Sequence, residues 1–153
     1  MIEVKNSAGE IIFVFAQGND KIFDEADLTG VNLAGALLEG AMFMGANLSS
    51  ANLEGADFYW GSFFQANLTG ANLRSALLRG CDFKEANMEG ADLSNADLGP
   101  DNLNGETKLQ GANLTGCVVT GARFERAEYD ANTRFPAGFD PVQHHMQLKS
   151  REP

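Results

Sequence analysis

The sequence has no long apolar run and little positive charge, and each shortage excludes a class of protein. No uninterrupted stretch of about eighteen or more apolar residues occurs, so we expect no membrane insertion. Only 11 Lys and Arg residues face 21 Asp and Glu residues, which makes the chain acidic with a net charge of −10. Nonspecific nucleic-acid binding requires cations that neutralise phosphates, so we expect no direct nucleic-acid binding. An acidic chain favours solubility and attraction to a basic partner.

Residues that carry chemistry are scarce as well. The only histidines, His144 and His145, lie side by side near the end of the chain, and the two cysteines, Cys81 and Cys117, lie far apart. No CxxC, HExxH, GxSxG, P-loop or dinucleotide motif is present. We therefore assign no catalytic, cofactor-binding or metal-binding residues, and we expect a protein that is not an enzyme and needs no cofactor.

The start of the chain does not resemble a signal peptide. Position 3 is acidic, and no clear small-residue cleavage site follows the apolar run of residues 11–16. We expect this segment to be mature structure, and a cytoplasmic location is the default expectation.

What the chain does contain is a five-residue repeat. In "ANLTGANLRSALLRGCDF", residues 66–83, a bulky residue returns at every fifth position, and a small one stands two places before it. Helices repeat near 3.6 residues and strands repeat at two, so neither explains this period. A chain that turns a corner in every unit does, because the bulky and the small residue then both point inward while Gly and Ser take the corners.

Four such corners close a square coil of twenty residues, and the aromatic residues support this length. Phe23, Phe43, Phe63 and Phe83 recur at a spacing of twenty. Stacked coils pair their backbones as strands do in a sheet, and they must be used in series because one coil cannot bury its apolar side chains. We predict an all-β quadrilateral parallel β-helix of about five coils.

The repeat is interrupted once. Its bulky positions run from Leu28 to Leu103 and resume at Leu109, so the phase slips by one residue. We expect a bulge or small loop within residues 104–108. In this register Leu103, and after it Phe124, continue the phenylalanine column, and Val119 joins the column of Leu98.

The pattern A(N/D)LxG resembles that of the pentapeptide-repeat family over residues 22–130. The resemblance implies that the helix is right-handed, and the two ends of the chain resemble those of bacterial members. Some members resemble duplex DNA in shape and charge and bind type II topoisomerases such as gyrase. The resemblance therefore implies, as an alternative function, a DNA-mimicking inhibitor of such an enzyme.

The segments outside the repeat are predicted to protect its ends. Residues 1–21 are expected to form an N-terminal cap, with a hairpin within residues 1–17 covering the first coil. In the C-terminal cap, residues 131–142, Phe135 and Phe139 are expected to plug the last coil. Residues 143–153 are polar and are expected to form a flexible tail.

Outward positions should be polar, but two adjacent faces carry apolar residues there. Such a patch commonly marks a contact surface, and Trp and Tyr are favoured anchors. We predict a protein-binding or scaffold module of unknown partner, with a homodimer as one possibility. The other interpretation is that the N-terminal hairpin or the tail covers the patch. The predicted patch consists of Leu37, Met42, Met44, Tyr59, Trp60, Phe64 and Leu77.

Overall fold

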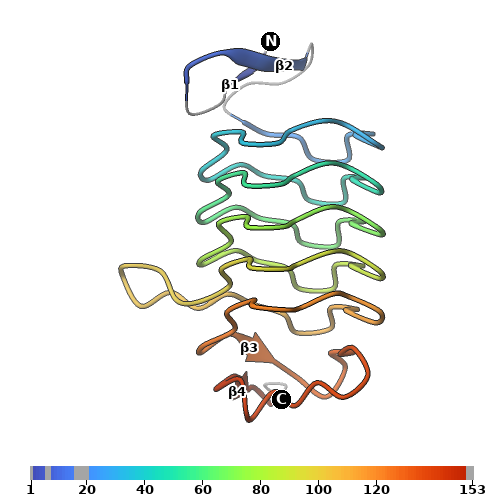
Figure 1. The fold of residues 1–153 in the computed structure, drawn as a ribbon, viewed down its shortest axis with the longest axis vertical. Helices are drawn as coiled ribbons and strands as arrows, with labels where there is room; N and C mark the ends of the chain where they lie inside the picture. The colour runs from blue at the N-terminus through green and yellow to red at the C-terminus, as the bar shows by residue number, and fades with distance from the viewer. Residues whose placement is uncertain (1, 6–7, 16–20, 151–153) are drawn as a thin grey trace.

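The computed structural model describes residues 2–5, 8–15 and 21–150, and this part of the chain contains strands and turns but no helix. Between the second and third strands the chain winds into a stack of four-sided coils (Figure 1). The predicted all-β class is therefore confirmed. The strands are β1 (Ile2–Lys5), β2 (Ile11–Phe15), β3 (Glu128–Tyr129) and β4 (Gln147–Leu148).

Parallel backbone ladders join successive coils, at a spacing of twenty residues in the first part of the rod. The amide of Leu33 donates to the carbonyl of Asn52 at 2.7 Å, and the amide of Asn52 donates to the carbonyl of Val31 at 2.9 Å. These bonds satisfy backbone groups that would otherwise be left unpaired. One ladder runs through five coil steps, which confirms the predicted number of coils: Ile22, Met42, Ser62, Asp82, Lys108 and Glu128.

The corners explain why each repeat position favours its residue type. At a typical corner the amide of Ala36 donates back to the carbonyl of Leu33 at 3.0 Å, and the intervening Gly35 has a φ of 68°. Glycine adopts this left-handed conformation at little cost. The Asn or Asp position braces the same turn, since the side chain of Asn32 accepts the amide of Ala34 at 3.2 Å.

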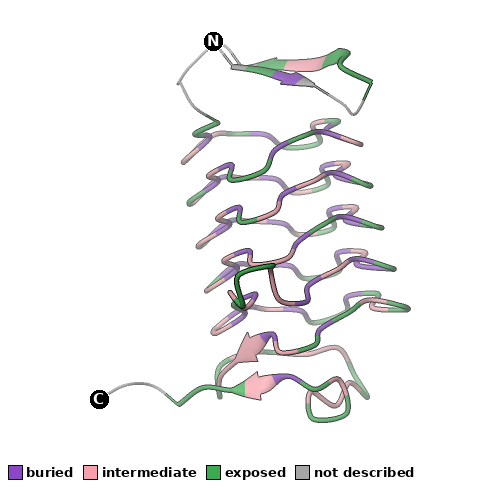
Figure 2. Ribbon diagram, turned by 90° about the vertical axis from the view of Figure 1, so that its left-hand side faces the viewer, coloured by how far each residue is buried: buried purple, intermediate pink, exposed green. Residues whose placement is uncertain are grey.

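The bulky and small residues of the repeat are buried, as predicted, and they recur along each coil (Figure 2). The rings of Phe23 and Phe43 stack with centroids 4.9 Å apart, and those of Phe63 and Phe83 stack at the same distance. Cys81 and Cys117 are buried in small-residue positions, so the prediction for them is confirmed. Burial raises the pKa of the Cys117 thiol to about 12, which makes it an inert core residue.

The interruption of the repeat is longer than the sequence suggested, and the placement of Leu103 was wrong. Asp82 bridges Lys108, so this coil takes 26 residues where the coils before it take 20, and six are inserted. Leu103 lies in the resulting loop, residues 99–106, and is 76% exposed. Leu109 fills the interior position instead. The loop projects from one corner of the rod (Figure 1).

The longer insertion also changes which residues stack after it. Asp97 bridges Arg123, so Phe124 follows Leu98 and does not rejoin the phenylalanine column. Asp92 bridges Val118, which places Val119 after Leu93. Slips of one and of six residues are equivalent modulo five, so the spacing of the repeat alone could not distinguish them.

An antiparallel hairpin lies at the N-terminal end of the rod (Figure 1). β1 pairs with β2, with Glu3 opposite Val14. Val4 is 1% exposed and belongs to the same apolar core as Phe23. Of the predicted cap, residues 1, 6–7 and 16–20 lie outside the described residues.

The C-terminal segment is more ordered than predicted, and the flexible tail is wrong for residues 143–150. β4 pairs in parallel with β3, and the amide of Lys149 donates to the carbonyl of Tyr129 at 2.7 Å. The ring of His144 stacks on that of Phe139 at 4.2 Å. These contacts give the segment backbone hydrogen bonds and a ring packed against the core. Its polar composition did not indicate either of them. Residues 151–153 of the predicted tail lie outside the described residues.

Candidate functional site

The side chains that point into the rod are buried and almost all apolar, so the candidate site lies on its surface. Among residues 2–5, 8–15 and 21–150 no group of three or more His, Cys, Asp and Glu side chains is placed to hold a metal ion. The same residues form no helix of the length and hydropathy that a bilayer crossing requires. On the surface, the predicted apolar patch lies beside one of several hollows.

One side of the rod carries alternating apolar and acidic residues, and we call it the Leu–Asp side. Its outward ladder residues are, in order along the rod, Leu37, Asp57, Leu77, Asp97 and Arg123. Leu37 and Leu77 are each 46% exposed. Because adjacent strands lie about 4.8 Å apart, the two leucines are separated by about 10 Å with Asp57 between them. The structure therefore places these two predicted patch residues on one side.

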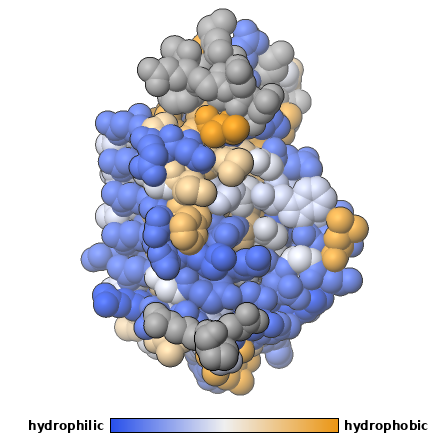
Figure 3. Space-filling view, turned by 180° about the vertical axis from the view of Figure 1, so that it is seen from behind, coloured by the Kyte–Doolittle hydropathy of each residue, from blue (hydrophilic) through white to orange (hydrophobic). Residues whose placement is uncertain are grey.

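The neighbouring side carries the methionines of the patch. Met42 is half-buried in the ladder between Ile22 and Ser62, and Met44 is exposed. Phe64 is half-buried, and the ammonium of Lys84 lies 6.0 Å from the centre of its ring. Seen from behind, apolar side chains gather over the half of the rod nearer the N-terminal hairpin (Figure 3).

Tyr59 and Trp60 lie at the corner between these two sides, where they hold the protein's own loop. Their rings are 4.5 Å apart, and the amide of Asn102 donates to the Tyr59 hydroxyl at 2.8 Å. The indole of Trp60 donates to the carboxylate of Asp101. Loop 99–106 thus covers part of the predicted patch, a possibility that the sequence did not suggest, and Trp60 remains 44% exposed.

The base of the loop is closed by a buried threonine. Thr107 occupies a small-residue position and is fully buried. Its hydroxyl donates to the carbonyl of Leu78 at 3.1 Å and accepts the amide of Gly80 at 3.1 Å. A buried hydroxyl without partners would be costly, so these bonds fix the point at which the chain re-enters the rod.

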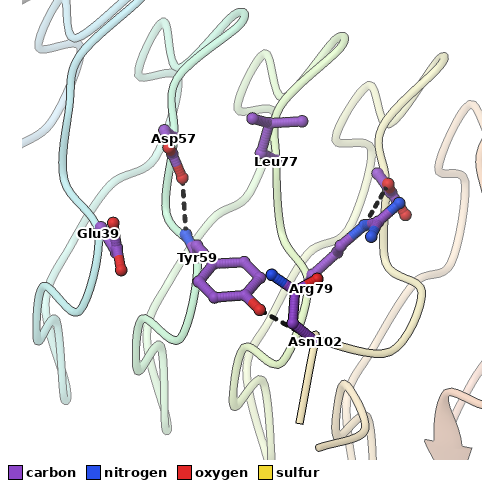
Figure 4. Close-up of a pocket in the computed structure, with 7 residues that line it drawn as sticks. Glu39, Asp57, Tyr59, Leu77, Arg79 and Asn102 are labelled. Atoms are coloured by element: carbon purple, nitrogen blue, oxygen red, sulfur yellow. Dashed lines mark hydrogen bonds and ion pairs between the residues drawn. The ribbon is translucent and has the colours of Figure 1, made fainter. Parts of the chain in front are cut away.

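A shallow hollow of about 440 Å³ lies on the Leu–Asp side next to the loop (Figure 4). Within it, the Nε of Arg79 donates to Asp97 at 2.6 Å, and a hydrogen bond and charge from this carboxylate raise the pKa of the guanidinium above its ordinary value. Asp97 also pairs with Arg123 at 3.3 Å. The lining residues are Glu39, Asp57, Tyr59, Leu77, Arg79, Asp97 and Asn102.

Sequence reasoning identified Tyr59 and Leu77 in this hollow but missed its charged residues. Asp57 and Asp97 stand in the repeat position that is commonly Asn or Asp, so nothing in the sequence marked them as candidate site residues. Asn102 belongs to the inserted loop, whose position depends on the length of the insertion. A signal was available there, because Asp101 stands two places before Leu103 and a charged residue does not fit an inward position.

Comparison with known proteins agrees with this architecture. The family description "Pentapeptide repeats" matches in eight copies over residues 22–58, 62–99 and 106–128, and the match is interrupted at the loop. No curated protein sequence shows significant similarity to the chain.

Several solved structures are similar to the chain. A pentapeptide repeat protein from the Arabidopsis thaliana thylakoid lumen is 34% identical, with 69% of this chain and 66% of that chain covered and a TM-score of 0.47. A pentapeptide repeat protein from Nostoc PCC 7120 is 32% identical, with 84% and 85% covered and a TM-score of 0.33. QnrB1, a plasmid-mediated fluoroquinolone resistance protein, is 18% identical, with 84% and 82% covered and a TM-score of 0.35.

The family match spans more than half of the chain and follows the coils that the backbone ladders define. Members of this family are right-handed quadrilateral β-helices, and the fold of this chain is of that kind. The chain belongs to the pentapeptide-repeat family.

Proposed function

We propose that the protein is a non-enzymatic binding module whose contact face is the Leu–Asp side together with the adjacent methionine side. The observation that carries the proposal is the exposure of Leu37, Leu77 and Trp60 on the Leu–Asp side and its corner. Exposed apolar side chains at one place favour association, because contact with a partner removes their surface from water. A filled rod lacks the deep pocket that enzymes use for small substrates.

The experiment is affinity capture from the source cell with the full chain as bait. The matched bait carries Leu37→Ser and Leu77→Ser, which remove two exposed apolar side chains but touch none of the bonds that hold loop 99–106. A control bait carries Val118→Ser and Val142→Ser, two other exposed residues. The captured protein is then purified, and its affinity for each bait is measured.

The proposal predicts that the leucine variant weakens binding about tenfold or more, as expected for apolar residues central to an interface. The valine control should bind as the original chain does. Equal affinities for the original chain and the leucine variant would contradict the proposal.

The acidic charge favours a second candidate, a DNA-mimicking ligand of gyrase. The net charge of −10 has the same sign as that of a nucleic acid. Arginines interrupt the acidic surface, however, and one of them, Arg74, pairs with Asp92 at 3.3 Å. A supercoiling assay with titrated protein tests this candidate. Inhibition or protection of gyrase would support it, and an unchanged rate at concentrations on the order of micromolar would exclude it.

A further inference from the structure

The hollow on the Leu–Asp side has an apolar part and an acidic part. Leu77 is 46% exposed, and the half-buried ring of Tyr59 also lines the hollow. Glu39 and Asp57 lie to one side of this ring, and Arg79 lies to the other (Figure 4). A long side chain entering the hollow would therefore meet apolar surface and carboxylates together.

The charges in the hollow are not balanced. The Nε of Arg79 is bonded to Asp97, a carboxylate that also pairs with Arg123. Asp57 uses Oδ1 to accept the amide of Tyr59 at 3.0 Å, and its other oxygen has no partner among the described residues. Nor does any described residue donate a hydrogen bond or form an ion pair to the carboxylate of Glu39. Two carboxylates thus face the hollow without an ion pair, since the ammonium of Lys21 donates to the backbone carbonyl of Glu39 at 3.2 Å and not to its carboxylate.

We propose that this hollow binds an arginine or lysine side chain from a basic segment of a protein partner, an inference that rests on the proposed function. The aliphatic stem of such a side chain packs on Leu77 and on the ring of Tyr59, while its cation lies near Glu39 and Asp57. The net charge of −10 attracts a basic segment from a distance.

Other occupants fit less well. An anionic group would meet the carboxylates of Glu39 and Asp57, and the Nε of Arg79 is already bonded to Asp97. A purely apolar segment would cover the carboxylates of Glu39 and Asp57 without compensating their charge, which is costly. A basic side chain satisfies both parts of the hollow.

The repeat itself supplies a substitution that removes charge and preserves the fold. Asn47 occupies the same repeat position as Asp57, and its side chain accepts the equivalent amide of Ser49 at 3.1 Å. The variant Asp57→Asn combined with Glu39→Gln therefore removes both unpaired carboxylates and keeps the turn. The control combines Asp27→Asn with Glu89→Gln, which removes the same amount of charge on other parts of the rod.

The probe is a fluorescein-labelled nona-arginine peptide, with binding followed by fluorescence anisotropy. The hollow variant is expected to bind about fivefold more weakly than the original chain, equivalent to about 1 kcal/mol, and the control less than about twofold. Equal weakening of the two variants would overturn the inference, because general charge attraction would then explain binding. Displacement of the peptide by an equimolar amount of spermine would also overturn it, since the hollow would then be a site for small cations.

The capture experiment separates failure of this inference from failure of the proposed function. If the leucine variant and the hollow variant both lose the captured protein, the proposed function and the inference about the hollow are both supported. If the leucine variant loses that protein and the hollow variant retains it, the face binds a protein but the inference about the hollow is wrong. If neither variant changes the affinity, the proposed function itself is wrong.

Discussion

The rings of Phe43 and Phe63, twenty residues apart in sequence, stack with centroids 5.0 Å apart and planes inclined by 8°. Phe58 meets both rings edge-on, at 5.8 Å from Phe43 and 5.2 Å from Phe63. Stacked and edge-on pairs of this kind add to the stabilisation that comes from burial. The aromatic core therefore links consecutive coils as well as residues within one coil.

Replacing Phe63 with alanine is expected to lower the free energy of unfolding by about 3–5 kcal/mol, because a large cavity opens among stacked rings. The adjacent Phe64 provides the matched control, since it is half-buried on the outside. Phe64→Ala should cost about 1 kcal/mol or less. Urea denaturation followed by circular dichroism measures both, and equal losses would show that the assignment of inside and outside is wrong.

The position of the insertion can be tested with two leucines. Leu109 is fully buried and Leu103 is 76% exposed. Leu109→Asp buries an unpaired charge and should cost several kcal/mol, enough to unfold the rod locally or entirely. Leu103→Asp should change the melting temperature little. Thermal unfolding measures the stability of both variants. A larger loss in Leu103→Asp than in Leu109→Asp would show that the chain slips by one residue and not by six.

Gly80 and Gly40 form a second matched pair. Both have a left-handed φ, of 69° and 72°. A Cβ at position 40 meets no atom within 4 Å, whereas at position 80 it would lie 2.7 Å from Trp60. Gly40→Ala should cost about 1–2 kcal/mol from backbone strain alone. Gly80→Ala should cost more and shift the tryptophan emission; identical losses in urea denaturation would contradict the packing of Trp60 against this coil.

Asp101 and Trp60 provide an optical report of protonation, because Trp60 is the single tryptophan in the chain. Burial opposes ionisation of Asp101, but hydrogen bonds from the Trp60 indole and from the amides of Gly105 and Leu103 outweigh it and lower its pKa. The stabilisation of the loop is therefore present above the unfolded pKa of about 3.9 and is lost as pH falls through the lower folded value.

Trp60 emission should consequently change with a midpoint below that ordinary aspartate pKa of about 3.9. In Asp101→Asn the transition should be absent. A midpoint above the ordinary value, or an unchanged titration in the variant, would show that Asp101 does not hold the loop through the indole.

Much of this structure could be predicted because each repeat position has one physical task. The inward positions require apolar or small side chains, and the second corner residue requires a left-handed φ, so Phe43 and Gly35 could be placed from spacing alone. Leu103 could not be placed in this way, because inserting five further residues leaves a five-residue repeat unchanged. The order of residues 143–150 also escaped prediction, since it comes from contacts such as that of His144 with Phe139 and not from a periodic pattern.

The candidate site was predictable only in part for the same reason. Leu37 and Leu77 broke the rule that outward residues are polar, so the sequence revealed them. Glu39 and Asp57 obeyed the rule, and their significance depends on which neighbours supply cations. That question depends on the three-dimensional pairing of Arg79 with Asp97.

The central claim is that the coils before the loop close at twenty residues, and that the coil carrying the loop closes at 26. A nuclear Overhauser spectrum of the full chain tests it most directly. Ring protons of Phe43 should give cross-peaks to those of Phe23 and Phe63, and the amide of Phe83 should lie next to Lys108, whose carbonyl it contacts at 2.8 Å. Absence of cross-peaks between the phenylalanine rings, or proximity of Phe83 to Asn102 in place of Lys108, would contradict the account.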